Sequence, residues 1–521
     1  MKKGFMILGF LLTHYAVTSQ YVLQNRKADY QWLMGYYDIQ FAPNGWLYDF
    51  NQNPMSYRLV NKLLKGDLLT ANVCNKEGNL AFYTNGCRIS DAQNRIIQGG
   101  DTINNGNAYI PLCNGGNSYS PTQGTVILPS MTDDSSYYMF HLRQALYIDS
   151  RTGVVAVDDL LLTKIVKKGD GYRVIFKDSV VLDYKNDSLL FAGQLTACRH
   201  ANGRDWWIIS PKYIEKDYYA LLFTPNGLIK KLQKNIGLQS PKTEYGGGMA
   251  VFSPDGKKYV RYNFLTDAQI FDFDRCTGKL SNFKHIPIKD DADETWAAGC
   301  AISPNSRFLY LASSTKLYQY DLWSDSILNT KFTFDIDTTL IDTTGSSPLY
   351  PLFYTCQLGA NGKIYIANTA SKSMHVIEKP DLKGAACELK QNGITLPIYI
   401  TGAIPFFPNF RLGAEKGSSC DTLTTALAEA DVGVKGKLSL YPNPAHDIVK
   451  IDMTLDEYGD LDKYTLRVVD IVGRVQSQYP LSNFASIKEI SVLGLANGLY
   501  FVQLVDRQGR VVANSKVVVA H

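Results

Sequence analysis

Several features that this 521-residue sequence lacks exclude whole classes of protein. After its first residues, no apolar run approaches the about 18 residues that a membrane-spanning helix needs. The 53 basic and 49 acidic residues nearly balance, and no run of Lys or Arg alternates with aromatic side chains. We therefore expect neither a membrane span nor a nucleic-acid partner.

Recognisable catalytic and metal motifs are also missing. The sequence has no CxxC pair, no Cys/His cluster with zinc spacing, no HExxH and no nucleophile elbow. Two acidic runs, 289–296 and 334–344, could supply oxygen ligands to calcium, but neither has the spacing of a recognised calcium loop. We expect solvated connections there and no cofactor, with calcium as the alternative.

The composition that is present favours strands and tight turns. The sequence contains 33 Tyr, 23 Phe and 41 Gly. Tyr and Phe fit pleated sheets, while Gly supplies the backbone angles that turns require. The chain is therefore predicted to be all-β.

Internal repeats give the architecture. Segments that begin at Ala250, Ala301 and Cys356 each read as strand, tight turn, strand, and weaker copies begin at Thr70, Val126 and Leu195. Their spacing of roughly 50 to 70 residues fits the blades of a β-propeller. We predict a propeller over residues 20–413 with seven blades, six being the alternative. The segment 405–412 is expected to complete a blade with strands near 55–62.

The first 19 residues have the layout of a secretory signal: two lysines, an apolar stretch and small residues before Gln20. Exported chains form disulfides, so the nine cysteines are expected to form bridges rather than bind metal. Cys87 and Cys113 flank a Gly- and Asn-rich connection, which makes them the first predicted pair. Two further predicted pairs are Cys276 with Cys300 and Cys387 with Cys420.

The composition changes after the propeller. Residues 414–437 are rich in Gly, Ser, Thr and Ala and are predicted to be a linker. Residues 438–521 contain alternating strand patterns that predict a small Ig-like antiparallel sandwich.

The segments LSLYPNPAHDIVKI, VVDIVGRVQ, ISVLGLANGLYFVQLVD and KVVVAH are similar, in order and spacing, to the type A C-terminal sorting domain of the type IX secretion system of Bacteroidetes. The motif positions are Tyr441, Pro442, Asn443, Pro444, Gly473, Arg474, Gly498 and Tyr500. The resemblance implies that the type IX machinery is a partner. It also implies passage through the periplasm and across the outer membrane, to the cell surface or the medium.

The upstream region resembles secreted Bacteroidetes propellers with an FYTDG-type blade, on segments such as NLAFYTNGCRI, FSPDGKKY and IPFFPNFRLG. This resemblance implies an architecture rather than an activity. Asp274 and Asp321 resemble the aspartates that close blade turns in WD-repeat propellers, which implies a structural role.

Candidate ligand-binding residues are few. Tyr36, Tyr37 and Trp46 lie in a loop-rich segment where sugars or proteins could stack on them, although packing at the ring closure is the favoured interpretation. Arg199 and His200 could line a central opening, although a structural role is again favoured. We predict a non-catalytic binding or adhesion protein for a surface glycan or protein. The alternative is a secreted propeller enzyme, lactonase-like or glycan-cleaving.

Overall fold

The computed structural model shows an all-β chain that divides into two compact units, Met1–Leu423 and Thr424–His521. The structure describes residues 27–35, 44–66, 69–113, 118–119, 122–145, 156–183, 190–213, 215–239, 247–288, 298–343, 348–369, 371–400, 402, 404–421, 436–455, 463–470, 474–481, 489–507, 509 and 511–521. The signal peptide expected at 1–19 lies outside these ranges. No helix within them has the length and apolar character needed to cross a membrane.

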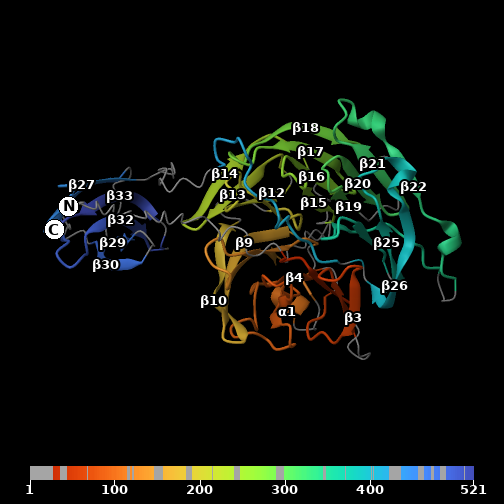
Figure 1. The fold of residues 1–521 in the computed structure, drawn as a ribbon, viewed down its shortest axis with the longest axis horizontal. Coiled ribbons are helices and arrows are strands. Elements are labelled where there is room, and N and C mark those ends of the chain that lie inside the picture. The colour runs from red at the N-terminus through yellow and green to blue at the C-terminus, as the bar shows by residue number, and fades with distance from the viewer. Residues whose placement is uncertain are drawn as a thin grey trace, which may run out of the picture. The chain divides into compact units, whose positions relative to one another are not determined.

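The first unit is a β-propeller, and its described residues form seven antiparallel sheets that follow one another around a ring in chain order (Figure 1). Two blades have three strands. Blade 1 contains β1 (Gln31–Met34), β2 (Gly45–Asp49) and β3 (Ser56–Val60), and blade 2 contains β4 (Ala71–Cys74), β5 (Leu80–Thr84) and β6 (Ile89–Asp91). A short helix α1 (Tyr109–Cys113) follows blade 2.

The other five blades have four strands each. Blade 3 contains β7 (Thr125–Pro129), β8 (Ser136–Ala145), β9 (Ala156–Lys168) and β10 (Gly171–Asp183); blade 4 contains β11 (Thr196–Arg199), β12 (Trp206–Pro211), β13 (Tyr218–Thr224) and β14 (Gly227–Gln233). Blade 5 contains β15 (Met249–Phe252), β16 (Lys258–Asn263), β17 (Asp267–Phe273) and β18 (Leu280–Ile286). Blade 6 contains β19 (Gly299–Ile302), β20 (Phe308–Ser313), β21 (Lys316–Asp321) and β22 (Phe332–Asp335), with the 3-10 turns η2 (Ile327–Thr330) and η3 (Thr338–Leu340). Blade 7 contains β23 (Cys356–Leu358), β24 (Ile364–Ala367), β25 (Ser371–Ile377), η4 (Gly384–Cys387) and β26 (Leu389–Ile400).

Turn residues end the inner strands as the sequence predicts. After β15, Gly256 has φ +75°, a backbone angle that side chains rarely adopt, and the Asp255 carboxylate accepts a hydrogen bond from the Lys257 N–H at 3.0 Å. After β19, the Asn305 side chain accepts from the Arg307 N–H at 3.0 Å. Each turn closes a hairpin between an inner strand and the next strand of its blade, β15 with β16 and β19 with β20.

Apolar clusters between neighbouring blades hold the ring together. The cluster between blades 1 and 2 includes Leu33 and Tyr83, and a larger one spans blades 2, 3 and 4. Further clusters join blades 4 and 5, blades 5 and 6, and blades 6 and 7. The last cluster packs Trp32 and Trp46 of blade 1 against Tyr365 of blade 7 and so closes the circle. Burial of both faces of each sheet is what a radial arrangement of blades provides.

The predicted closure by residues 405–412 is wrong. This segment forms no strand with blade 1 and instead runs across the centre of the ring. Pro405 and Pro408 lack the N–H that a sheet ladder requires, which explains why the apolar run does not add a strand.

The second unit is a small sandwich of two sheets. One contains β27 (Gly436–Tyr441), β28 (Ile448–Leu455) and β31 (Glu489–Ser491). The other contains β29 (Tyr464–Asp470), β30 (Val475–Pro480), β32 (Gly498–Asp506) and β33 (Val511–Val519). Val449, Leu466 and Val502 lie in the buried core between the sheets.

The sorting-motif residues support the ends of these strands. Asn443 donates to the Lys516 carbonyl at 3.0 Å and accepts from the Val518 N–H at 2.8 Å, so the Pro-rich turn is fastened to β33. Arg474 bonds Asp470 across the β29–β30 hairpin, and the Tyr500 hydroxyl donates to the Ala496 carbonyl. Gly473 lies outside the described residues.

Candidate functional site

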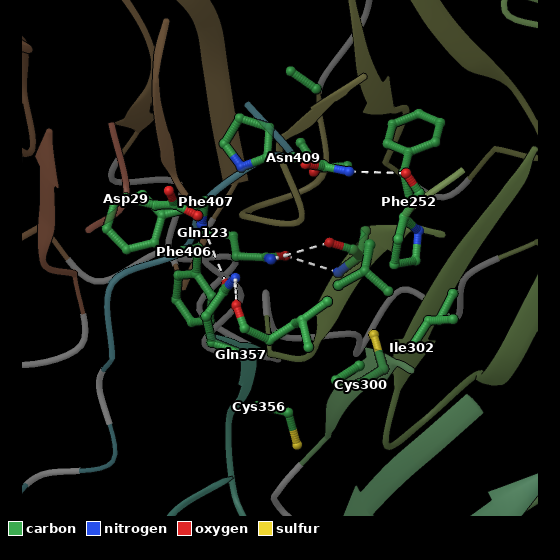
Figure 2. Close-up of a pocket in the computed structure, with 18 of the residues that line it drawn as sticks. Asp29, Gln123, Phe252, Cys300, Ile302, Cys356, Gln357, Phe406, Phe407 and Asn409 are labelled. Carbon is green, nitrogen blue, oxygen red and sulfur yellow. Dashed lines mark hydrogen bonds between the residues drawn. The ribbon is translucent and has the colours of Figure 1, made fainter. Parts of the chain in front are cut away.

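A cavity of about 250 Å³ lies at the centre of the ring. Inner strands β7, β11, β15, β19 and β23 supply its walls, and the turns at Pro254 and Pro304 lie at its rim. Figure 2 shows that these lining side chains come from widely separated parts of the chain. The sequence predicted a central opening but did not identify the residues that line it.

One wall of the cavity is formed by residues 404–413, which we call the strap. Phe407 stacks on Trp32 of blade 1 with ring centroids 6.0 Å apart, and Phe410 meets Trp206 of blade 4 edge-on at 5.9 Å. The Asn409 amide donates to the Pro254 carbonyl at 2.8 Å. The strap thus ties blades 1, 4 and 5 together across the ring.

An ion pair between a buried carboxylate and a partly exposed guanidinium fixes the strap to the beginning of the propeller. Arg411 donates from Nη1 to Asp29 Oδ1 at 2.6 Å and from Nη2 to Oδ2 at 2.8 Å. Burial by itself would lower the pKa of Arg411, but the Asp29 carboxylate outweighs it and holds that pKa above its usual value. Among the described lining residues these two are the charged ones, and they neutralise each other.

The remaining polar lining consists of amides and hydroxyls. Gln123 spans from blade 3 to blade 5, where its amide donates to the Ala250 carbonyl at 3.0 Å and accepts from the Ala250 N–H at 2.7 Å (Figure 2). Gln357 accepts from the Phe407 N–H at 3.2 Å. The hydroxyl of Thr125 is buried and has no hydrogen-bond partner. It is therefore the lining group that most requires one.

Two thiols, Cys300 and Cys356, also line the cavity. Both are buried and free, and burial raises the pKa of each thiol above its usual range. The protonated thiol is a poor nucleophile and a poor metal ligand. These cysteines act as small apolar wall residues.

Arg199 and His200 lie outside this cavity. The Arg199 guanidinium is buried 3.8 Å from the ring centre of Trp206, and burial lowers its pKa. His200 donates from Nε2 to the Cys276 carbonyl at 3.0 Å and accepts at Nδ1 from the Asn202 N–H at 3.1 Å. His200 packs between blades 4 and 5, whereas Arg199 packs on Trp206 of its own blade 4. Neither side chain lines the cavity, so the idea that they line the opening is wrong.

Trp46 is fully buried in the cluster that closes the ring between blades 1 and 7, so a role as an exposed ligand platform is wrong for it. It sits within β2, where alternate side chains face the neighbouring blade. Tyr36 and Tyr37 lie outside the described residues.

The structure contains the predicted disulfide between Cys87 and Cys113. The predictions for the other cysteines are wrong, because the second disulfide joins Cys276 to Cys420, while Cys300 and Cys387 are buried and free. Residues 414–421, predicted as linker, pack on the propeller: the Glu415 N–H donates to the Ala201 carbonyl, and Cys420 is bridged to blade 5.

The acidic run 289–296 lies outside the described residues. In the second run, Asp335 pairs with Lys316 and Asp337 caps η3. No group of three or more His, Cys, Asp or Glu side chains is placed to hold a metal ion in the ranges that the structure describes.

Sequence reasoning also missed Trp323. Its side chain follows β21 and is 64% exposed, whereas Trp32, Trp46, Trp206 and Trp207 are fully buried. The sequence does contain an indication of this exposure. Asp321 ends strand β21, so Trp323 lies in the turn that follows the strand.

Comparisons identify the second unit more firmly than the first. Residues 439–520 match the family of secretion system C-terminal sorting domains. No curated protein matches the chain.

Two solved structures illustrate the likeness, each at low identity. PorZ, described as an essential surface component of the type IX secretion system of Porphyromonas gingivalis, is 13% identical with TM-score 0.32, over 92% of this chain and 63% of PorZ. A proposed 6-phosphogluconolactonase from Bacteroides fragilis is 11% identical with TM-score 0.38, over 72% of this chain and 98% of that one. This chain therefore spans about 63% of the length of PorZ. Likenesses at this level carry no argument about activity.

Proposed function

We propose that this chain, which ends in a secretion system C-terminal sorting domain and is exported to the cell surface or secreted, is a binding protein rather than an enzyme. In this proposal the second unit directs export by the type IX machinery, and the propeller recognises a small, uncharged, polar ligand in its axial cavity.

The unpartnered hydroxyl of Thr125 is the observation that carries the proposal. A buried hydroxyl without a hydrogen bond costs about 1–3 kcal/mol. The Thr125 oxygen has almost no accessible surface in this side-chain conformation, so a bound polar group would recover that free energy once the side chain rotates toward it. The cavity volume of about 250 Å³ suits a ligand of few heavy atoms. Because Asp29 and Arg411 neutralise each other, an uncharged ligand fits better than an ionic one.

The groups available in the cavity support recognition over catalysis. Acid–base chemistry needs a proton donor and acceptor within reach of the substrate. The lining carboxylate, Asp29, is committed to Arg411, and both lining thiols are protonated. His141, His200 and His375 lie outside the lining and are hydrogen-bonded in the blades.

Calorimetric titration of the full chain tests the proposal, with glucose, N-acetylglucosamine, myo-inositol and δ-gluconolactone as probes. At least one probe should bind with one-to-one stoichiometry. Thr125→Val, which removes the hydroxyl at nearly constant volume, should weaken that binding by about tenfold, or 1.4 kcal/mol. Thr125→Ser should retain it.

Equal binding by wild type and Thr125→Val, or no binding by any probe, would contradict the cavity assignment. Saturable hydrolysis of δ-gluconolactone that is lost in Asp29→Asn would instead favour the enzyme alternative.

A further inference from the structure

Trp323 forms an exposed aromatic surface on blade 6, outside the cavity lining. It is the one described tryptophan that the fold does not bury, since Trp32, Trp46, Trp206 and Trp207 have no exposed area. Burying an indole is among the largest apolar contributions that a side chain makes to folding. Packing therefore does not explain why a tryptophan occupies this turn.

The residues around Trp323 hold it in a defined position. Its backbone N–H donates to Asp321 Oδ1 at 3.1 Å, and the Arg307 guanidinium lies 5.2 Å from the ring centre. The following turn is anchored by Thr330, whose hydroxyl donates to the Ile327 carbonyl at 2.6 Å and accepts from the Asp321 N–H at 2.9 Å. The exposed ring therefore sits on a supported turn rather than on a free loop.

Arg307 places hydrogen-bonding groups beside the ring, and the buried Asp321 carboxylate positions the Arg307 guanidinium. Arg307 bonds Asp321 through Nε at 3.0 Å and Nη2 at 2.7 Å, and its side chain stays 39% exposed. The Asp321 carboxylate raises the pKa of Arg307, and Arg307 lowers the pKa of Asp321, so both remain charged and cancel. The surface combines a flat apolar face with an ion pair whose two charges cancel, and Lys383 also acts on the Asp321 carboxylate.

The size and charge of this surface point to a sugar rather than a protein. A tryptophan side chain offers about 150–250 Å² in total, whereas a stable protein interface needs about 800 Å² from each partner. A pyranose ring presents a C–H face of matching size and hydroxyl groups at its edge. We propose that Trp323 and Arg307, which the buried Asp321 holds in place, bind a pyranose unit of a neutral glycan.

The test titrates the full chain by calorimetry with maltohexaose, cellohexaose, laminarihexaose, mannohexaose and xylohexaose. At least one of these neutral probes should bind and should protect the exposed tryptophan fraction from quenching by acrylamide. Trp323→Ala should weaken binding by at least about tenfold, and Arg307→Met should weaken it severalfold. Tyr350→Ala, which removes another exposed aromatic ring of 47% exposure, should have no effect.

Absence of binding by all five probes, or equal binding by wild type and Trp323→Ala, would overturn the proposal. Tighter binding of polygalacturonate than of the neutral probes would overturn the proposal that the glycan is neutral. Self-association that is lost in Trp323→Ala, seen by sedimentation velocity without glycan binding, would assign the surface to a second copy instead. Thr125→Val, a change in the axial cavity, should leave hexasaccharide binding unchanged. The proposed cavity function and the proposed glycan binding at Trp323 can therefore fail independently of each other.

Discussion

The ion pair between Arg411 and Asp29 joins residues 382 positions apart, and breaking it should destabilise the propeller substantially. Asp29 has a side chain only 3% exposed, while Arg411 is 33% exposed. Removing one partner of a buried pair costs about 3–5 kcal/mol because the remaining charge loses its partner without regaining water. Partial solvent access at Arg411 lowers our expectation for Arg411→Met to about 2–4 kcal/mol.

Replacing the charged residues of the pair by neutral ones should lower the free energy of unfolding by unequal amounts. Asp29→Asn removes the deeply buried charge and leaves a guanidinium that reaches solvent, so it should cost only about 1–2 kcal/mol. The double variant Asp29→Asn with Arg411→Met has no buried charge and should cost less than the two single variants together. The difference is the coupling free energy of the pair.

Urea unfolding followed by tryptophan fluorescence measures these values for the propeller, because all six tryptophans precede residue 324. The exposed pair Lys76–Asp134 is the matched control, and Lys76→Met should leave the free energy of unfolding nearly unchanged. The reasoning is refuted if Arg411→Met unfolds within 1 kcal/mol of the wild type, or if the double variant equals the sum of the singles.

Three further predictions concern export, crosslinks and pH. Deleting residues 438–521 should leave the propeller in the periplasm, and surface labelling equal to that of the full chain would contradict this. Replacing Cys276 and Cys420 by Ser opens a loop of 144 residues and should cost up to about 5 kcal/mol in the chain-entropy model, seen as a lower urea midpoint; an unchanged midpoint would argue against the crosslink. Burial lowers the pKa of His141 and of His375 to about 4, from about 6.5 in the unfolded chain. The unfolded state therefore binds more protons below pH 6.5, and folding stability falls as the pH drops from 6.5 to 4. At pH 5 the loss should be about 2 kcal/mol for His375, and His141 should add to it in the same direction. His375→Gln should flatten the pH dependence of the urea midpoint.

Local pattern predicted the blades well where each repeat is self-contained. In blades 5 and 6 each unit of strand, turn and strand is contiguous in the sequence. Turn residues such as Asp255 and Asn305 mark where the turn lies. The sorting motif is equally local, which is why its family could be identified on 82 residues. The strap is different, because its position depends on partners in four other blades that no local pattern specifies.

The disulfide pairing also depends on contacts between distant segments, which local sequence patterns do not specify. Cys276 and Cys300 are near in sequence, but Cys300 lies in an inner strand with its thiol buried at the axis, whereas Cys276 lies in the turn after β17. Cys276 can meet Cys420 only because the strap carries the chain back to blade 5. Pairing by sequence proximity fails once a segment crosses the ring.

Trp46 and Trp323 differ in exposure because they differ in position relative to the end of a strand. Trp46 comes directly after the turn-favouring residues Pro43-Asn44-Gly45 and lies inside strand β2, where a large ring packs against the next blade. Trp323 follows Asp321, a residue that ends its strand by accepting a hydrogen bond from the Trp323 N–H itself. A ring placed just after such an aspartate has left the sheet and has no neighbouring blade to pack against. Position relative to the strand end, rather than the local density of aromatic residues, therefore decides which ring is free to meet a ligand.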